Sequence, residues 1–129
     1  MEAKSIKKIS EAELTETALA YARKITKIIE TSGRSDQKFF DSLNIAYDVE
    51  VILMTSKYTG LRAVERQVME AYASTDGSAN LGDNLQKMGN DSLLYTKPLY
   101  NKVKGSDLEF AKALALRIHK KAVILSIKN

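Results

Sequence analysis

The chain has 129 residues, of which 44% are hydrophobic and 28% are charged, and its formal net charge is +4. These proportions are typical of one folded, soluble domain, and they exclude disordered, collagen-like and fibrous proteins. Because the chain contains no cysteine, disulfide bonds, thiolate metal sites, cysteine nucleophiles and covalently attached c-type haem are excluded as well. No apolar stretch approaches the roughly 20 residues of a membrane span, and the first residues lack the apolar core of a signal peptide.

Positive charge is concentrated near the C-terminus. Residues 97–129 contain eight Lys and Arg residues and two acidic residues, so that residues 1–96 carry a net charge of −2. A basic segment of this kind can bind nucleic acid or anionic lipid. However, the chain has no tryptophan and no recognition-helix or RNA-binding motif. We therefore expect solvated lysines beside buried strands, and no nucleic-acid partner.

A helix is predicted to begin at Ser10. Residues 1–9 are polar and rich in lysine, so we expect a flexible arm there and a single domain over residues 10–129. Ser10 and Glu13 form a capping box, and Gly33 offers a helix stop. Between these signals, apolar residues recur at helical spacing, namely Leu14, Ala18, Ala22, Ile25 and Ile29.

Two further helices are predicted before residue 75. Ser35 is a candidate cap for the second helix, which we expect to continue to about Ser56 on an irregular helical period. The stretch from Val49 to Thr55 is also β-branched and apolar enough for a buried strand, and periodicity alone does not separate these alternatives. A third helix, ending near Ser74, is indicated by apolar residues at Leu61, Val64, Val68 and Tyr72.

Residues 75–91 are predicted to form a loop, with room for one helical turn. The segment contains only three large apolar residues, Leu81, Leu85 and Met88. Because a connection of this length inside a domain is usually functional, we expect a ligand loop or lid there. Residues 92–103 indicate extended structure, in which Pro98 favours an edge position or a strand end.

The last segment is compatible with a helix or with strands. As a helix it would begin at Ser106 and present one apolar stripe, formed by Leu108, Ala111, Ala115, Ile118 and Ala122. As strands, residues 113–118 would alternate, the chain would turn at residues 119–121, and Val123, Leu125 and Ile127 would alternate again. Leucine and alanine favour the helix, whereas the terminal AVILSI favours a strand.

Few residues of the chain are suited to catalysis. A nucleophilic triad would need the one histidine, His119, as its base, but no nucleophile motif accompanies it. No transition-metal ligands stand at suitable spacing, and no phosphate-binding glycine loop is present. We therefore predict that the protein is not an enzyme and holds no metal. The alternative cofactor is non-covalent haem with His119 as its axial ligand.

Aromatic residues form the predicted ligand site. Tyrosines recur along the chain, and together they would line a pocket for a small apolar or aromatic ligand. Packing in the core, with hydroxyls that reach the surface, is the alternative role. The candidate ligand-binding residues are Tyr47, Tyr58, Tyr72, Tyr95 and His119.

Three segments, taken in order, resemble a bacterial family of small extracytoplasmic sensor domains with a PAS-like fold, many of which carry c-type haem. The segments are residues 58–72 (YTGLRAVERQVMEAY), residues 94–100 (LYTKPLY) and the closing RIHKKAVILSI. Glu65 matches the glutamate of a family helix, and Tyr95, Pro98 and Leu99 match a family strand. The family's Cys-x-x-Cys-His motif is absent, and KYTG stands where the family has Arg-Asn-Pro.

The resemblance implies an α+β fold, in which long N-terminal helices pack on a small antiparallel sheet, and it favours strands at the C-terminus. It also implies a non-enzymatic ligand-sensing or ligand-binding domain of the bacterial cell envelope, periplasmic or at the cell surface, without covalent haem. The expected partners are a small ligand and either a homodimer or a signalling protein. The alternative is a cytoplasmic all-α bundle, a structural protein that acts through self-association or a partner chain.

Overall fold

The computed structural model describes residues 10–55, 57–74, 82–102 and 108–127. The predicted arm at residues 1–9 lies outside these ranges. Four helices accompany a four-stranded sheet in the described chain, in the order α1 (Glu11–Ser32), α2 (Gln37–Tyr47), β1 (Val49–Met54), α3 (Ala63–Ser74), β2 (Asn84–Met88), β3 (Ser92–Lys102), β4 (Leu108–His119) and α4 (Lys120–Ile127). The expected α+β class is confirmed, and the all-α alternative is wrong.

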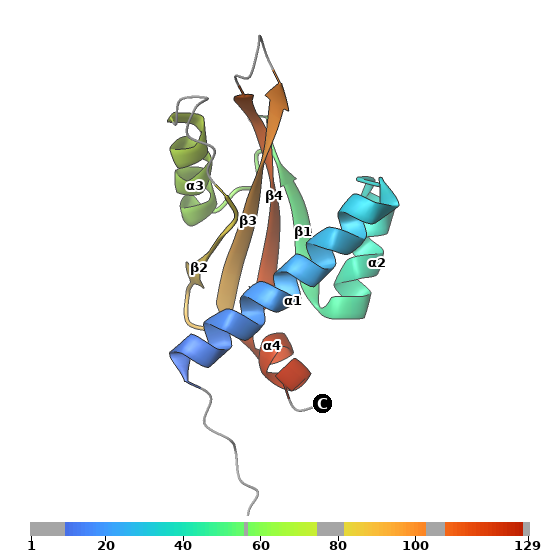
Figure 1. The fold of residues 1–129 in the computed structure, drawn as a ribbon, viewed down its shortest axis with the longest axis vertical. Helices are drawn as coiled ribbons and strands as arrows, with labels where there is room; N and C mark the ends of the chain where they lie inside the picture. The colour runs from blue at the N-terminus through green and yellow to red at the C-terminus, as the bar shows by residue number, and fades with distance from the viewer. Residues whose placement is uncertain (1–9, 56, 75–81, 103–107, 128–129) are drawn as a thin grey trace, which may run out of the picture.

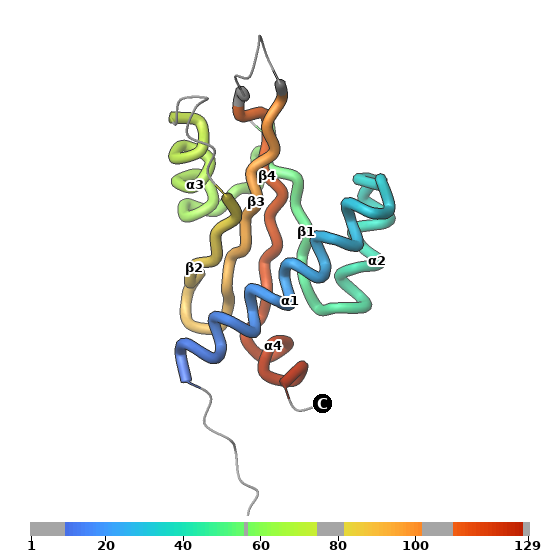
Figure 2. Tube along the Cα trace, in the orientation of Figure 1, coloured from blue at the N-terminus to red at the C-terminus, as the bar shows by residue number. Residues whose placement is uncertain are grey.

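The sheet is antiparallel throughout, with the strand order β1-β4-β3-β2 (Figures 1 and 2). β3 and β4 are the long central strands, whereas β1 and β2 are the short edges. Pairing between β2 and β3 ends at Asn84 and Thr96, so Pro98 lies beyond the reach of β2. This position satisfies the expectation for Pro98, because a proline has no N–H to donate to a neighbouring strand.

Local signals account for α1. The Ser10 hydroxyl accepts a hydrogen bond of 3.1 Å from the Glu13 N–H, and Gly33 ends the helix in the left-handed conformation with φ 68°. A side chain at φ near +68° would be strained, which is why glycine suits this position. The five apolar residues predicted to form the stripe are all buried against the sheet. The prediction for this helix is confirmed.

The second helix is shorter than predicted. It is capped by Asp36, whose carboxylate accepts from the Phe39 N–H, and it ends at Tyr47. Asp48 adopts the left-handed conformation with φ 55°, and the edge strand β1 follows directly. The expected continuation of the helix to Ser56 is therefore wrong. Asp48 breaks the helix, and the β-branched residues after it are buried between the sheet's two helical layers.

Two further predictions are corrected at β2 and α4. The expected loop at residues 75–91 contains β2, which pairs with β3 and turns back at Gly89, where φ is 76°; residues 75–81 lie outside the described chain. At the C-terminus, residues 108–119 form the strand β4, as the strand alternative expected, whereas residues 120–127 form the helix α4 rather than a second strand. Val123 of α4 is fully buried in the core that contains the α1 stripe.

The sheet separates two apolar layers. On one face it packs against α1, α2 and α4, through a core that includes Ile25, Tyr95 and Leu116. On the other face, α3 is the one helix of the described residues that covers the sheet. It packs through Val68 and Tyr72 on a smaller cluster of sheet residues, namely Ile52, Met54, Leu94, Ala113 and Ala115. In Figure 1, α1 crosses the sheet obliquely, with α2 and α4 at its sides, while α3 stands next to β2.

Candidate functional site

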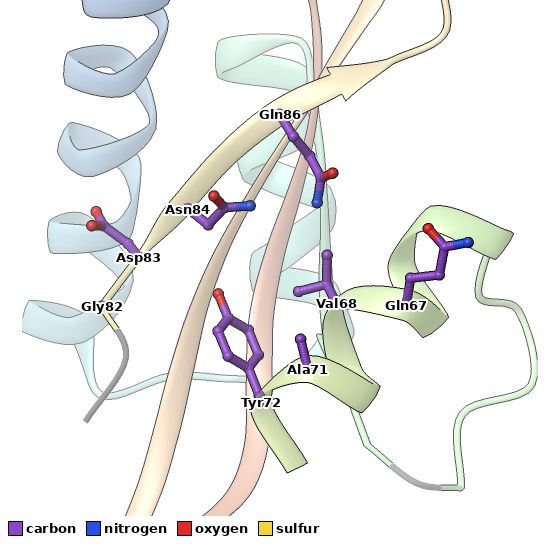
Figure 3. A pocket seen from close by; sticks show the side chains of 8 residues that line it. All are labelled: Gln67, Val68, Ala71, Tyr72, Gly82, Asp83, Asn84 and Gln86. Carbon is purple, nitrogen blue, oxygen red and sulfur yellow. The ribbon is translucent and has the colours of Figure 1, made fainter. Parts of the chain in front are cut away.

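A cavity of about 460 Å³ lies between α3 and the edge strand β2. This volume falls within the range of about 300–1,000 Å³ that is typical of small-molecule sites. In Figure 3, Val68 and Tyr72 of α3 lie below Asn84 and Gln86 of β2, with the cavity between them. The residues that line the cavity are Gln67, Val68, Ala71, Tyr72, Gly82, Asp83, Asn84 and Gln86.

The composition of β2 explains why this space is open. α3 rests on the inner strands, where alanines and Leu94 form an apolar floor. β2 instead turns polar side chains toward α3, because Asn84 is paired with Thr96 and Gln86 with Leu94 across the sheet, and paired residues share a face. Neither amide extends the apolar floor under the helix. The result is a cavity with one apolar wall and one wall of amides.

Tyr72 of α3 lines the cavity and contacts the sheet. Its side chain is buried, and its hydroxyl lies 2.8 Å from the Thr96 hydroxyl on β3. Burial raises the pKa of the Tyr72 hydroxyl, although the hydrogen bond with Thr96 acts in the opposite direction. Tyr72 is therefore uncharged at neutral pH and presents a neutral ring to the cavity.

Asp83 contributes its backbone to the cavity, while its carboxylate faces away. Arg23 of α1 donates two hydrogen bonds to this carboxylate, from Nε at 2.8 Å and from Nη2 at 3.1 Å, and the Tyr95 hydroxyl donates a third at 2.7 Å. The side chain of Asp83 points to the opposite side of β2 in Figure 3. The hydrogen bond from Arg23, and to a smaller extent the one from Tyr95, lowers the pKa of Asp83 to about 2, although burial acts to raise it. Asp83 is thus ionised at neutral pH, and Arg23 balances the one formal charge among the described residues that line the cavity.

A buried ion pair holds the start of α3 against the sheet. Glu65 of α3 is 0% exposed, and Arg117 of β4 donates to both of its oxygens, from Nε at 2.6 Å and from Nη2 at 2.7 Å. Arg117 also donates to Glu50 of β1 and to the carbonyl oxygen of Gly60, while the Arg62 N–H donates to Glu65. Burial acts to raise the pKa of Glu65, but the hydrogen bonds from Arg117 and Arg62 outweigh it and hold the pKa below its usual range.

The five residues predicted to form the ligand site do not share one cavity. Tyr72 lines the cavity beside α3, whereas Tyr95 lies on the other face of the sheet and borders this cavity only through its bond to Asp83. Tyr47 packs edge-on against Tyr21 of α1 and accepts the Tyr21 hydroxyl at its backbone carbonyl. The other two candidates, Tyr58 and His119, lie elsewhere on the surface and are exposed.

The sequence interpretation missed Asn84 and Gln86. Their alternation with Leu85, which packs on the opposite face of the sheet, is the signal of a half-buried strand. The stretch is short and rich in loop-forming residues, and that composition obscured the alternation. The sequence resemblance singled out Glu65 but assigned it no role. In the structure, Glu65 is the ion-pair partner of Arg117.

The described residues contain no group of three or more His, Cys, Asp and Glu side chains that could hold a metal ion. Within the same ranges, no helix combines the length and the apolar character needed to cross a membrane. No family model matches the chain, and comparison with curated proteins and with solved structures finds no significant similarity.

Proposed function

We propose that this chain is a small-molecule-binding domain that acts as a sensor, without catalysis and without covalent haem. The cavity between α3 and β2 carries the proposal, because it combines ligand-sized volume, an apolar wall and convergent amide groups. A location in the bacterial cell envelope belongs to the same proposal, and its support is the resemblance in sequence described above.

The chemistry of the cavity wall favours an uncharged ligand with a flat, hydrogen-bonding edge. Each amide of Asn84 and Gln86 offers a donor and an acceptor, whereas the amide of Gln67 points away from β2 in Figure 3. A charged ligand would lose its hydration without gaining a counter-ion, because the carboxylate of Asp83 is already bound to Arg23. Heterocycles that carry an amide or lactam edge fit these requirements, with the ring against Val68 and Tyr72.

The proposal can be tested by NMR spectroscopy of the isotopically labelled chain. The probes are uracil and nicotinamide as neutral heterocycles, and benzoate and benzylamine as charged rings of similar size. We expect the neutral probes to shift the side-chain amide signals of Asn84 and Gln86 and the backbone signals around Ala71. The charged probes should leave these signals in place.

A pair of variants on α3 supplies a matched control. Ala71→Leu places an isobutyl group in the cavity, whereas Ala73→Leu makes the same change at an exposed position of the helix that does not line it. We expect the first variant to abolish the shifts and the second to retain them. Equal shifts in both variants, or shifts confined to other parts of the chain, would contradict a site between α3 and β2.

A further inference from the structure

A second hollow runs along the opposite edge of the sheet. It has a volume of about 300 Å³ and lies between α2 and the edge strand β1, with Tyr58 at its border. We call this surface the β1 groove. Its lining residues are Ser35, Gln37, Phe40, Asp41, Asn44, Glu50, Val51, Ile52, Leu53 and Tyr58.

The strand in this groove has one unpaired side. β1 stands at the end of the strand order and pairs with β4 alone among the described strands. Its sequence, VEVILM, is apolar and β-branched and contains no proline, so it lacks the features that usually block an edge apart from Glu50. An edge of this kind can accept a further strand through its free backbone groups.

The groove is acidic. Asp41 and Glu50 line it, and the lining contains no Lys, Arg or His. Arg117 contacts Glu50 at 3.1 Å, but the positive charge of Arg117 is shared with Glu65, which it binds through two hydrogen bonds. These three side chains together carry one net negative charge, and the Glu50 side chain is 52% exposed.

An exposed aromatic ring borders the acidic groove. Tyr58 is 41% exposed, and it is one of the few large apolar residues of the described chain that are not covered. A Cβ atom on Gly60 would lie only 3.0 Å from the ring carbon Cε1 of Tyr58. The absence of a side chain at Gly60 therefore lets the ring lie against the backbone, beside the groove, where its face can contact a cation.

We propose that the β1 groove binds an extended, basic peptide segment of a partner protein, which adds to the sheet as a fifth strand. In this arrangement the backbone of the peptide pairs with the free side of β1. Its Lys and Arg side chains contact Asp41 and Glu50, and one of them lies over Tyr58. The groove and the ligand cavity lie at opposite edges of the sheet and share no lining residue, so this inference does not rest on the proposed ligand site.

The test uses a synthetic peptide as the probe, acetyl-TKVRVKT-amide with a fluorescent label, and acetyl-TEVEVET-amide as its acidic counterpart. Fluorescence anisotropy measures the affinity of each peptide for the complete chain, and NMR locates the site. We expect the basic peptide to bind more tightly and to shift the backbone amide signals of β1. Binding should weaken as salt is added, because the contacts include exposed charges.

Three exposed residues provide variants that leave the core intact. Asp41→Lys should weaken binding of the basic peptide about tenfold or more, through like-charge repulsion. Tyr58→Leu should weaken it about two- to fivefold, which is the range of an exposed cation–π contact. Glu16→Lys makes the same charge reversal on the exposed surface of α1 and should stay within about twofold of the unmodified chain. Circular dichroism of each variant should match that of the unmodified chain, which checks that the variant is folded.

Several outcomes would overturn the proposal. One is equal affinity for the acidic and basic peptides, and another is a loss of affinity in Glu16→Lys as large as that in Asp41→Lys. The absence of any shift in the β1 amides would do the same. If the chain alone forms dimers in sedimentation, with β1 in the interface, a second copy occupies the groove and the peptide assignment is wrong.

Discussion

Removal of the Glu65 side chain should destabilise the fold strongly, because it leaves a cation without its main partner. In Glu65→Ala, Arg117 loses its hydrogen bonds of 2.6 and 2.7 Å, and the Arg62 N–H loses its acceptor. The Arg117 side chain is 11% exposed, so water cannot fully replace these bonds. Removal of one partner of a buried ion pair costs about 3–5 kcal/mol, which is a large part of the stability of a domain of this size.

Urea unfolding followed by far-UV circular dichroism measures this loss. Since the slope of such curves is about 1–3 kcal/mol per molar urea, the midpoint should fall by about 1 M or more. Lys87→Ala is the control, because Lys87 pairs with Glu11 at 3.4 Å with both side chains well exposed. Its effect should stay within about 0.5 kcal/mol.

A double variant distinguishes the ion pair from simple loss of packing. Glu65→Leu combined with Arg117→Met removes both charges and keeps most of the volume. The double variant should be more stable than the sum of the single changes predicts, with a coupling energy of about 2–3 kcal/mol. If Glu65→Ala costs less than about 1 kcal/mol, or if the two single changes are additive, the reasoning from burial is refuted.

Three further outcomes are expected. Tyr72→Phe should cost about 1–3 kcal/mol in urea unfolding, because it leaves the buried Thr96 hydroxyl without its partner; unchanged stability would contradict this. Asp48→Gly should raise the thermal midpoint, since glycine adopts φ 55° without strain, and a lower midpoint would count against a strained Asp48. The fold lowers the pKa of Asp83 to about 2 and also lowers the pKa of Glu65. In acid, both carboxyl groups therefore bind fewer protons in the folded chain than in the unfolded chain. The free energy of unfolding should fall as the pH drops below the unfolded pKa values and toward 2. Asp83→Asn should make this decline shallower, and an unchanged acid titration of unfolding would exclude Asp83 as a contributor.

The elements that were predicted correctly depend on signals within one segment. α1 carries its cap at Ser10, its stop at Gly33 and a complete apolar stripe, and each signal acts over a few residues. Strand β3 was likewise expected from its residue types. The end of α2 was missed because its helical period and the β-branched run overlap, and the left-handed Asp48 that separates them has no unique sequence signature.

The missed parts depend on contacts between distant segments. β2 forms because β3 provides a partner strand, and the polar sequence of β2 alone would remain a loop. The ion pair between Glu65 and Arg117 joins residues 52 positions apart. Tyr72 was identified as a candidate from its residue type. Its cavity is also lined by Asn84 and Gln86, and the register of β2 against β3 determines the face of the sheet on which these two side chains lie. Sequence spacing carries no information about that register until the pairing is known.

The attachment of Asp83 to α1 has a consequence for how the proposed ligand site would respond. Arg23 and Asp83 fasten the start of β2 to a helix of 22 residues, which is about 33 Å long. A ligand that shifts β2 would act on this ion pair, whose Arg23 side chain is 57% exposed and which therefore couples β2 to α1 only modestly. Thermodynamic reciprocity then requires that a molecule whose affinity for α1 is changed by the ligand changes the ligand affinity by the same factor. Under the proposed function, α1 would therefore respond to ligand binding in the cavity, and a partner bound to α1 would change the ligand affinity.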